Sequence, residues 1–346
     1  MPLDNLHEHF AGQPKYRLLQ AKEAVYGALA ESWAEATTLP QSLRESLDRE
    51  CPLSLSADFF VSRDQRAVKA LITLSDSQKI ESVLLKSADG RHSLCLSSQV
   101  GCAMGCQFCA TAGLGFSRNL EAEEIIRQVL LMARYLSGHD GPEVRISNII
   151  FMGMGEPFLN YDNVMAAIKI LNDPQGFNLG ARHFSISTSG IISGIQKLAR
   201  EKLQINLAIS LNAPNDQLRS RLMPVNNKYP IDKLIMAVKD YVKRTNRLVM
   251  FEYLMIKKVN DDLSSARQLV RLLKGNLHLV NLIAYNPSGK FLAAEPKQIA
   301  AFKKILTDGG LKVTQRVSLG RDIMAACGQL AARGASSQSN SACAAS

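Results

Sequence analysis

The sequence predicts an α/β protein whose main body is a partial (βα)6 barrel, and three observations support this. Apolar runs of strand length alternate with helical patterns from residue 93 onward, which is typical of parallel βα units. Six such runs occur, fewer than the eight of a closed barrel. The 346 residues are 46% hydrophobic, which is enough apolar surface for one large core with a small accessory unit.

The elements can be placed in order along the chain. The N-terminal part predicts a small helical unit with helices at about 16–34 and 40–49, separated by TTLP. Short apolar runs punctuated by DSQ and ADGR then predict a β-rich stretch. The expected division is a helical accessory domain at 1–55, a β-rich connector at 56–93, the barrel core at 94–332 and a disordered, low-complexity tail at 333–346.

The barrel strands are expected where buried apolar runs occur, and active sites of parallel α/β folds gather where such strands end. The six runs are LCLSS (94–98), SNIIFMG (147–153), FSISTSG (184–190), INLAISL (205–211), VMFEYLMI (249–256) and LVNLIAYN (279–286). Helices are expected between them, for example at EAEEIIRQVLLMARYL and PIDKLIMAVKDYVKR.

Three cysteines follow the first barrel strand in GCAMGCQFCATAGLGFSRNL, residues 101–120, with C-x3-C-x2-C spacing. A structural zinc site needs four protein ligands, and no second pair follows nearby. Disulfides are disfavoured in a long chain with clustered thiols. A [4Fe–4S] cluster held by Cys102, Cys106 and Cys109 explains the missing ligand, because one iron then lacks a protein ligand and can bind a small molecule.

Polar residues end the later strands. In MGMGEP, residues 152–157, the glycines let a ligand approach the backbone, and Glu156 can pair with an ammonium group. STSG, SLN and YNP place Ser187, Ser210, Asn212 and Asn286 at three further strand ends. Such residues are also common as caps and loop starts, but their repetition around one rim favours a polar ligand.

The charge distribution is uneven. The net charge is +10, and residues 219–258 hold ten Lys or Arg against three acids. This basic region is either a solvated face or a surface that binds a polyanion. No apolar run reaches the roughly 20 residues that cross a bilayer, and the N-terminus lacks the apolar core of a signal peptide. A cytoplasmic protein without a membrane partner is expected.

The motifs CLSSQVGC, CQFCATAGLGFSRNL, MGMGEP, STSG, LMP…YPID, NLIAYNP and DIMAACGQL occur in this order over about residues 13–332. Together they closely resemble the RlmN/Cfr family of radical S-adenosylmethionine RNA methyltransferases. The resemblance implies that the N-terminal domain contacts RNA and that S-adenosylmethionine binds the open iron of the cluster. It also implies which residues bind S-adenosylmethionine: Gly155, Glu156, Ser187, Ser210, Leu211, Asn212 and Asn286.

Two outlying cysteines gain roles through this resemblance, although a lone cysteine is more often a small buried hydrophobe. The resemblance implies that Cys327 takes a methyl group from a first S-adenosylmethionine. A second one, cleaved at the cluster, activates that methyl group for addition to adenine. Cys95 then attacks the Cys327 sulfur, and a transient disulfide releases the product. Glu81 falls where the family has a proton acceptor, against the alternative of an ordinary exposed strand residue.

The implied substrate is an adenine of 23S rRNA, methylated at C2, and for many members also the tRNA adenine beside the anticodon. The basic region 219–258 is then expected to face RNA. Reduced ferredoxin or flavodoxin is the implied electron donor, and a monomer is expected. Two alternatives stay open: methylation at C8, as in the Cfr branch, and a metal-containing RNA-binding module without catalysis. Asn212 replaces the usual histidine, and Leu319 replaces a usual arginine, so those two contacts are in question.

Overall fold

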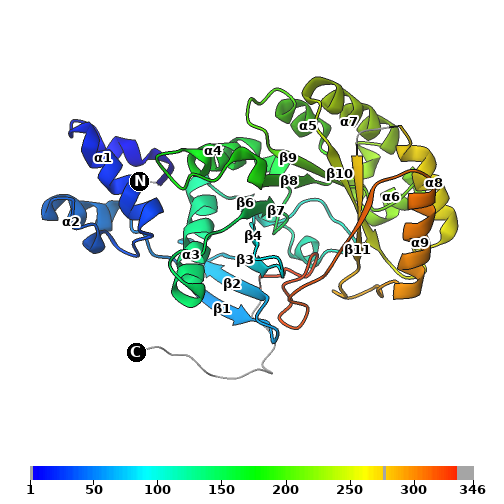
Figure 1. Cartoon of the computed structure of the whole chain (residues 1–346), viewed down its shortest axis with the longest axis horizontal. Coiled ribbons are helices and arrows are strands. Elements are labelled where there is room, and N and C mark those ends of the chain that lie inside the picture. The colour runs from blue at the N-terminus through cyan, green and yellow to red at the C-terminus, as the bar shows by residue number, and fades with distance from the viewer. Residues whose placement is uncertain (1–2, 276–277, 333–346) are drawn as a thin grey trace.

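A curved sheet of ten strands forms the centre of the computed structural model, which describes residues 3–275 and 278–332 (Figure 1). The predicted disordered tail, with Cys343, lies outside the described residues. In spatial order the strands are β1 (Ser56–Val61), β2 (Ala67–Thr73), β3 (Lys79–Lys86), β4 (His92–Cys95), β7 (Asn148–Phe151), β8 (Phe184–Thr188), β9 (Asn206–Ser210), β10 (Val249–Met255), β11 (His278–Ala284) and β12 (Val313–Arg316).

The partial barrel is confirmed. The six predicted runs form β4, β7, β8, β9, β10 and β11, and each pairs in parallel with the next. Strands covered on both faces read as continuous apolar runs, which is why the sequence exposes them. A seventh parallel strand, β12, was not predicted, because VTQR contains one aliphatic residue and lies at the sheet edge beside β11.

Helices lie around the outside of the curved sheet, as α3, α4, α5, α7, α8 and α9 do in Figure 1. The α-helices are α1 (Lys15–Lys22), α2 (Gln41–Glu50), α3 (Ala122–Asp140), α4 (Tyr161–Asn172), α5 (Ile192–Leu198), α6 (Asp216–Leu222), α7 (Ile231–Thr245), α8 (Leu263–Leu273) and α9 (Pro296–Asp308). Short helices of other types lie at η1 (Leu3–Phe10), η2 (Glu23–Gly27), η3 (Trp33–Glu35), η4 (Ala110–Leu114), η5 (Pro157–Asn160), η6 (Ala181–His183) and η7 (Pro224–Asn227). Among the described helices, none is both long and apolar enough to span a bilayer.

The helix expected at 16–34 is wrong as one element. Helix α1 ends at Lys22 and passes into the π-helical turn η2, and Leu29 then takes a left-handed conformation that breaks the helical path. A new turn starts at Trp33, whose backbone N–H donates to Asp48 and whose indole N–H donates to the Cys51 carbonyl. Burying this large ring decides the local path of the chain.

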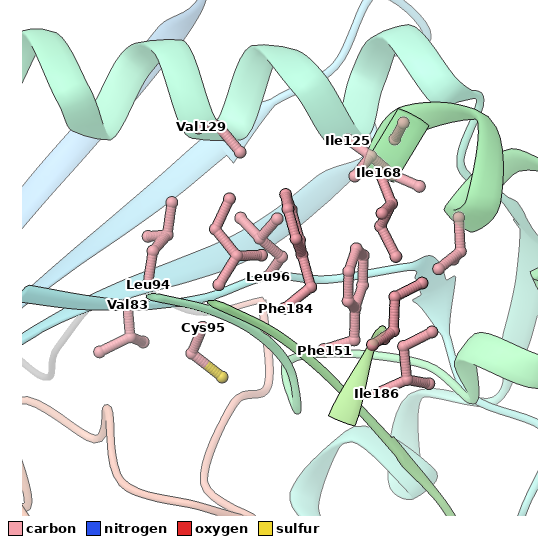
Figure 2. Close-up of a cluster of buried hydrophobic side chains, with 14 of the residues drawn as sticks. Val83, Leu94, Cys95, Leu96, Ile125, Val129, Phe151, Ile168, Phe184 and Ile186 are labelled. Carbon is pink, nitrogen blue, oxygen red and sulfur yellow. The ribbon is translucent and has the colours of Figure 1, made fainter. Parts of the chain in front are cut away.

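The β-rich stretch continues the sheet of the barrel. Strands β1, β2 and β3 pair with one another antiparallel, and β3 pairs with β4 so that Val83 lies opposite Cys95. On β4, side chains alternate between the two faces. Figure 2 shows Leu94 and Leu96 pointing toward α3, whereas Cys95 and Val83 point to the opposite face. The cysteine is therefore directed away from the helical layer.

Candidate active site

A cavity of about 170 Å³ opens at the carboxyl ends of the barrel strands. The cysteine loop, the ends of β7 to β11 and the turns after β12 contribute to its walls. Nine predicted site residues line it: Cys102, Cys106, Cys109, Gly155, Glu156, Ser187, Ser210, Asn212 and Cys327. The fold thus collects residues more than 200 positions apart into one chamber.

The loop that carries the three cysteines is fixed at its base and along its length. A small hairpin of β5 (Gln99–Gly101) and β6 (Phe116–Asn119) closes the base. Gly101 has φ +73°, and a Cβ there would collide with the carbonyl oxygen of Gly115. Further along, the backbone N–H of Gln107 donates to Leu222 and that of Ala110 donates to Gly328, at 2.9 and 2.8 Å. The loop is therefore ordered by contacts to α6 and to the C-terminal turns.

The chemistry of the three thiols fits an iron–sulfur group. Burial raises the pKa of Cys102 to about 11 and that of Cys106 still further, with contributions from the neighbouring thiols and Glu156. Iron binding would displace these protons, so assembly of the group is coupled to proton release. In the part of the chain that the structure describes, no three such side chains converge on one metal ion. The thiols instead share the wall of a chamber.

Glu156 is a buried carboxylate that joins two strand ends. Its Oε1 accepts from the backbone N–H of Phe158 at 3.1 Å, and its Oε2 accepts from the N–H and the hydroxyl of Ser189, both at 2.7 Å. Burial raises the pKa of Glu156, and the bonds from Ser189 oppose that shift. Gly155 before it has φ +99°, and a Cβ there would lie 2.6 Å from the Cβ of Gln99. This turn therefore tolerates no side chain at position 155.

Two of the predicted ligand residues act on neighbouring backbone. Asn212 has φ +56°, a conformation that asparagine tolerates well, and its Oδ1 accepts from the N–H of Leu254 at 2.9 Å. Asn286 is fully buried and does not line the chamber; its amide donates to the Cys327 carbonyl at 3.2 Å and accepts from Arg321 at 2.8 Å. Leu211 is fully buried and does not line the chamber.

Arg219 was missed as a site residue and was counted in the RNA-facing basic region, which is wrong for this side chain. It is 0% exposed, and its guanidinium donates to the carbonyls of Ser189, Leu211 and Ser210 and to Asn226. Burial lowers the pKa of Arg219 to about 10, so it remains charged at neutral pH. The cation ties together the ends of β8 and β9 where they line the chamber.

Replacing Arg219 with methionine is expected to destabilise the protein by about 3–5 kcal/mol, because the carbonyls of Ser189, Leu211 and Ser210 each lose a hydrogen bond from a charged donor. Urea unfolding measures this, with Arg221→Met as the exposed control on the same helix. A loss below about 1 kcal/mol, the scale of an exposed surface pair, would contradict the role assigned to Arg219.

Cys95 and Cys327 share a second, small cavity with Arg316 and Leu319, the residue that departs from the family pattern. Of the described cysteines, Cys327 is the one that lines both this cavity and the main chamber. Burial, reinforced by Cys327, raises the pKa of Cys95 to about 12, so the Cys95 thiol is neutral at physiological pH. Cys327 therefore lies between Cys95 and the three cysteines of the loop.

Glu81 is buried in β3, so the alternative of an exposed strand residue is wrong. Its carboxylate forms an ion pair with Lys69 at 3.3 Å, and both side chains are 1% exposed. Glu81 lies on the same face of β3 as Val83, which lines the small cavity, but Glu81 lines neither cavity itself.

Similarities to known proteins show the family to which the chain belongs. Residues 96–270 match the model of the radical SAM superfamily. A protein of Dictyoglomus turgidum, described as a probable dual-specificity RNA methyltransferase RlmN, is 42% identical over 93% of this chain and 92% of that protein. A namesake from Syntrophomonas wolfei is 45% identical over 95% of both chains. The crystal structure of a radical SAM methyltransferase from Sphaerobacter thermophilus superposes with TM-score 0.92 at 44% identity, covering 96% of this chain and 98% of that one.

A partial barrel with three clustered thiols at its carboxyl rim defines a radical SAM enzyme. Such enzymes use a [4Fe–4S] cluster and S-adenosylmethionine. Within that superfamily, the chain belongs to the RlmN family of RNA methyltransferases.

Proposed function

We propose that this enzyme methylates C2 of a specific adenine in 23S rRNA and also the adenine beside the anticodon in tRNA. The relatives are described as dual-specificity RNA methyltransferases, which supports two RNA classes. The observation that carries the proposal is the position of Cys327 in the walls of both cavities, with Cys95 in the second. A methyl carrier must reach the cofactor and then the thiol that releases the product. Cys327 lines both the main chamber and the cavity that contains Cys95.

The proposed cofactor site follows from the chamber walls. Cys102, Cys106 and Cys109 hold the [4Fe–4S] cluster, which supplies the electron for reductive cleavage of S-adenosylmethionine. Ser187 and Ser210 offer hydroxyls, and Gly155 contributes backbone to the wall of the chamber. The proposed S-adenosylmethionine site also includes Glu156, Leu211, Asn212 and Asn286, of which Glu156 and Asn212 line the chamber.

The proposed chemistry explains why two further thiols are present. C2 of adenine is electron-poor and has no lone pair, so it cannot displace a methyl group from a sulfonium itself. Cys327 does this displacement through its sulfur, as thiolates do well, and then carries the one-carbon group to the base. Cys95 gives up its thiol proton and attacks the Cys327 sulfur, and the bond from that sulfur to carbon breaks. The released carbon takes up a proton to become the methyl group, and the product leaves as a disulfide forms. Glu81 is proposed to accept the ring proton.

The remaining proposals concern the domains, the electron donor, the cellular location and the oligomeric state. The helical unit at 1–55 would contact RNA, and the β-rich stretch 56–93 would join it to the core at 94–332. The electron donor would be reduced ferredoxin or flavodoxin. Ribosomal and transfer RNA as substrates place the enzyme in the cytoplasm, where it would act as a monomer.

The test is to incubate the reconstituted enzyme with protein-free 23S rRNA and tRNA, and to identify the methylated nucleoside by mass spectrometry. We expect 2-methyladenosine in both. Methylation at C8 would be recognised by loss of the exchangeable C8 proton, and it would contradict the C2 assignment. RNA that is bound but never modified would contradict the whole proposal in favour of a binding module.

Changing Cys106 to alanine is expected to remove the cluster, because two thiolates cannot replace a set of three. Anaerobic reconstitution followed by iron and sulfide analysis measures this; the unchanged chain should hold about four irons. Cys95→Ala is the matched control and should retain them. Iron retained by the Cys106 variant at the unchanged level would remove this cysteine from the cluster.

A further inference from the structure

Glu252 is a buried carboxylate that no step above uses. It lies on β10, is 4% exposed and lines the main chamber. Its Oε2 accepts from the amide of Asn281 at 2.8 Å, and the Oδ1 of Asn281 accepts in turn from the hydroxyl of Thr314 at 3.0 Å. The orientation of the Glu252 carboxylate is therefore fixed by a chain of bonds across three strands.

The second carboxylate oxygen, Oε1, is buried and has no hydrogen-bond partner among the described residues. Burial raises the pKa of Glu252, while the charge of Arg316 and the bond from Asn281 oppose that shift. An unpaired buried acceptor is costly, and proteins rarely retain one without a use. Because Glu252 lines the chamber, a donor on a bound ligand is a candidate partner for this oxygen.

Arg316 stands close to this carboxylate. Glu252, Asn281 and Thr314 form one row across β10, β11 and β12, and Leu254, Ile283 and Arg316 form the row nearer the carboxyl ends. Thr314 and Arg316 are two positions apart on β12, so their side chains share one face.

The two cavities meet around Cys327, since Met152, Ile283 and Cys327 line both. Arg316 lines one cavity and Glu252 the other, so an acceptor and a donor flank the cysteine. Among the described residues, the hydrogen bond found for the Arg316 guanidinium goes to the sulfur of Met152 at 3.5 Å, which is a weak acceptor. The guanidinium keeps most of its donors available.

A hydrogen-bond acceptor and a donor are the groups that one edge of an adenine ring requires. The exocyclic N6 amine of adenine is a donor, and the adjacent ring nitrogen, N1 or N7, is an acceptor. Guanine and hypoxanthine carry an oxygen at C6, which a carboxylate would repel. Resting on the proposed function, we propose that Glu252 and Arg316 recognise an adenine ring, Glu252 by accepting from the N6 amine and Arg316 by donating to a ring nitrogen.

Two molecules bring an adenine ring to this chamber: the target RNA and S-adenosylmethionine. The test therefore has two binding arms, neither of which needs turnover. In the first, the unchanged protein is titrated at fixed salt with an anticodon stem-loop RNA whose target base is adenine, purine (no C6 substituent) or hypoxanthine. In the second, the reconstituted protein is titrated with S-adenosylhomocysteine and with its analogue that lacks the 6-amino group.

One of the two ligands carries the adenine that Glu252 and Arg316 recognise. For that ligand, we expect the affinity of the unchanged protein to fall roughly tenfold or more when the 6-amino group is removed. Glu252→Gln should abolish this preference. The Asn281 amide would hold the new carbonyl oxygen at the Oε2 position, so the new NH2 would face the chamber and favour hypoxanthine over adenine. Glu295→Gln, at an exposed carboxylate paired with Lys257, is the matched control and should behave as the unchanged chain does.

If the unchanged protein binds both ligand sets but is indifferent to the amine in both arms, the proposal is overturned, whatever the variant does. If the Glu252 variant keeps the full preference for the 6-amino group, Glu252 does not recognise the adenine. Arg316→Met gives an independent measurement, with an expected loss of affinity for adenine and no gain for hypoxanthine. Failure of the unchanged protein to bind any RNA would instead contradict the proposed function, and the cofactor arm would still test Glu252.

Discussion

Replacing Cys327 with alanine is expected to abolish RNA methylation, by at least about a thousandfold, as loss of a covalent catalyst usually does. The methyl group would have no sulfur to travel on, and C2 of adenine cannot accept it directly. The nucleosides of treated RNA should contain no methylated adenine, and intact-protein mass spectra should lack the methylated form of the unchanged enzyme.

The same variant should keep its iron, because Cys327 lies beside the three clustered thiols without belonging to their loop. It should also still consume S-adenosylmethionine under reducing conditions. Normal methylation by this variant would show that no cysteine carrier exists at position 327.

Replacing Cys95 with alanine is expected to trap a covalent complex between protein and RNA. Cys95 shares a cavity with Cys327 and is the described thiol that can attack its sulfur there. Without this attack, the bond between Cys327 and the methylated base persists. A denaturing gel of reactions with labelled RNA measures the complex as a slow band that nuclease removes.

The double variant Cys95→Ala with Cys327→Ala is the matched control and should give no such band. Free methylated RNA released at the unchanged rate by the single variant would exclude Cys95 from the release step.

Much of the fold could be predicted from the sequence, because parallel strands buried on both faces have uninterrupted apolar runs. The cluster site could also be predicted, since all three cysteines lie within one loop. Strand β12 escaped because an edge strand needs few apolar residues, and VTQR resembles a loop. The break after α1 was not predicted, because the helical pattern of apolar residues continues through Leu29. The backbone of Leu29 is left-handed and does not continue the helix.

The site residues that were missed are charged residues whose partners are remote in sequence. Arg219 is one of ten cations in a basic stretch, and only the carbonyls of two strand ends distinguish it from its neighbours. Glu252 sits inside an apolar strand, which was a usable signal: a lone acid in VMFEYLMI must be satisfied inside the protein. Charge by itself does not report burial.

The hydrogen bond from Asn286 to the Cys327 carbonyl limits how the main chain can move at position 327. Asn286 holds the main chain at position 327, and the bond from Ala110 to the Gly328 carbonyl holds it one residue later. With the peptide anchored at both points, the Cys327 side chain lines both cavities from one fixed backbone position. A change in the position of the sulfur would then need side-chain rotation only, which is fast compared with movement of the main chain.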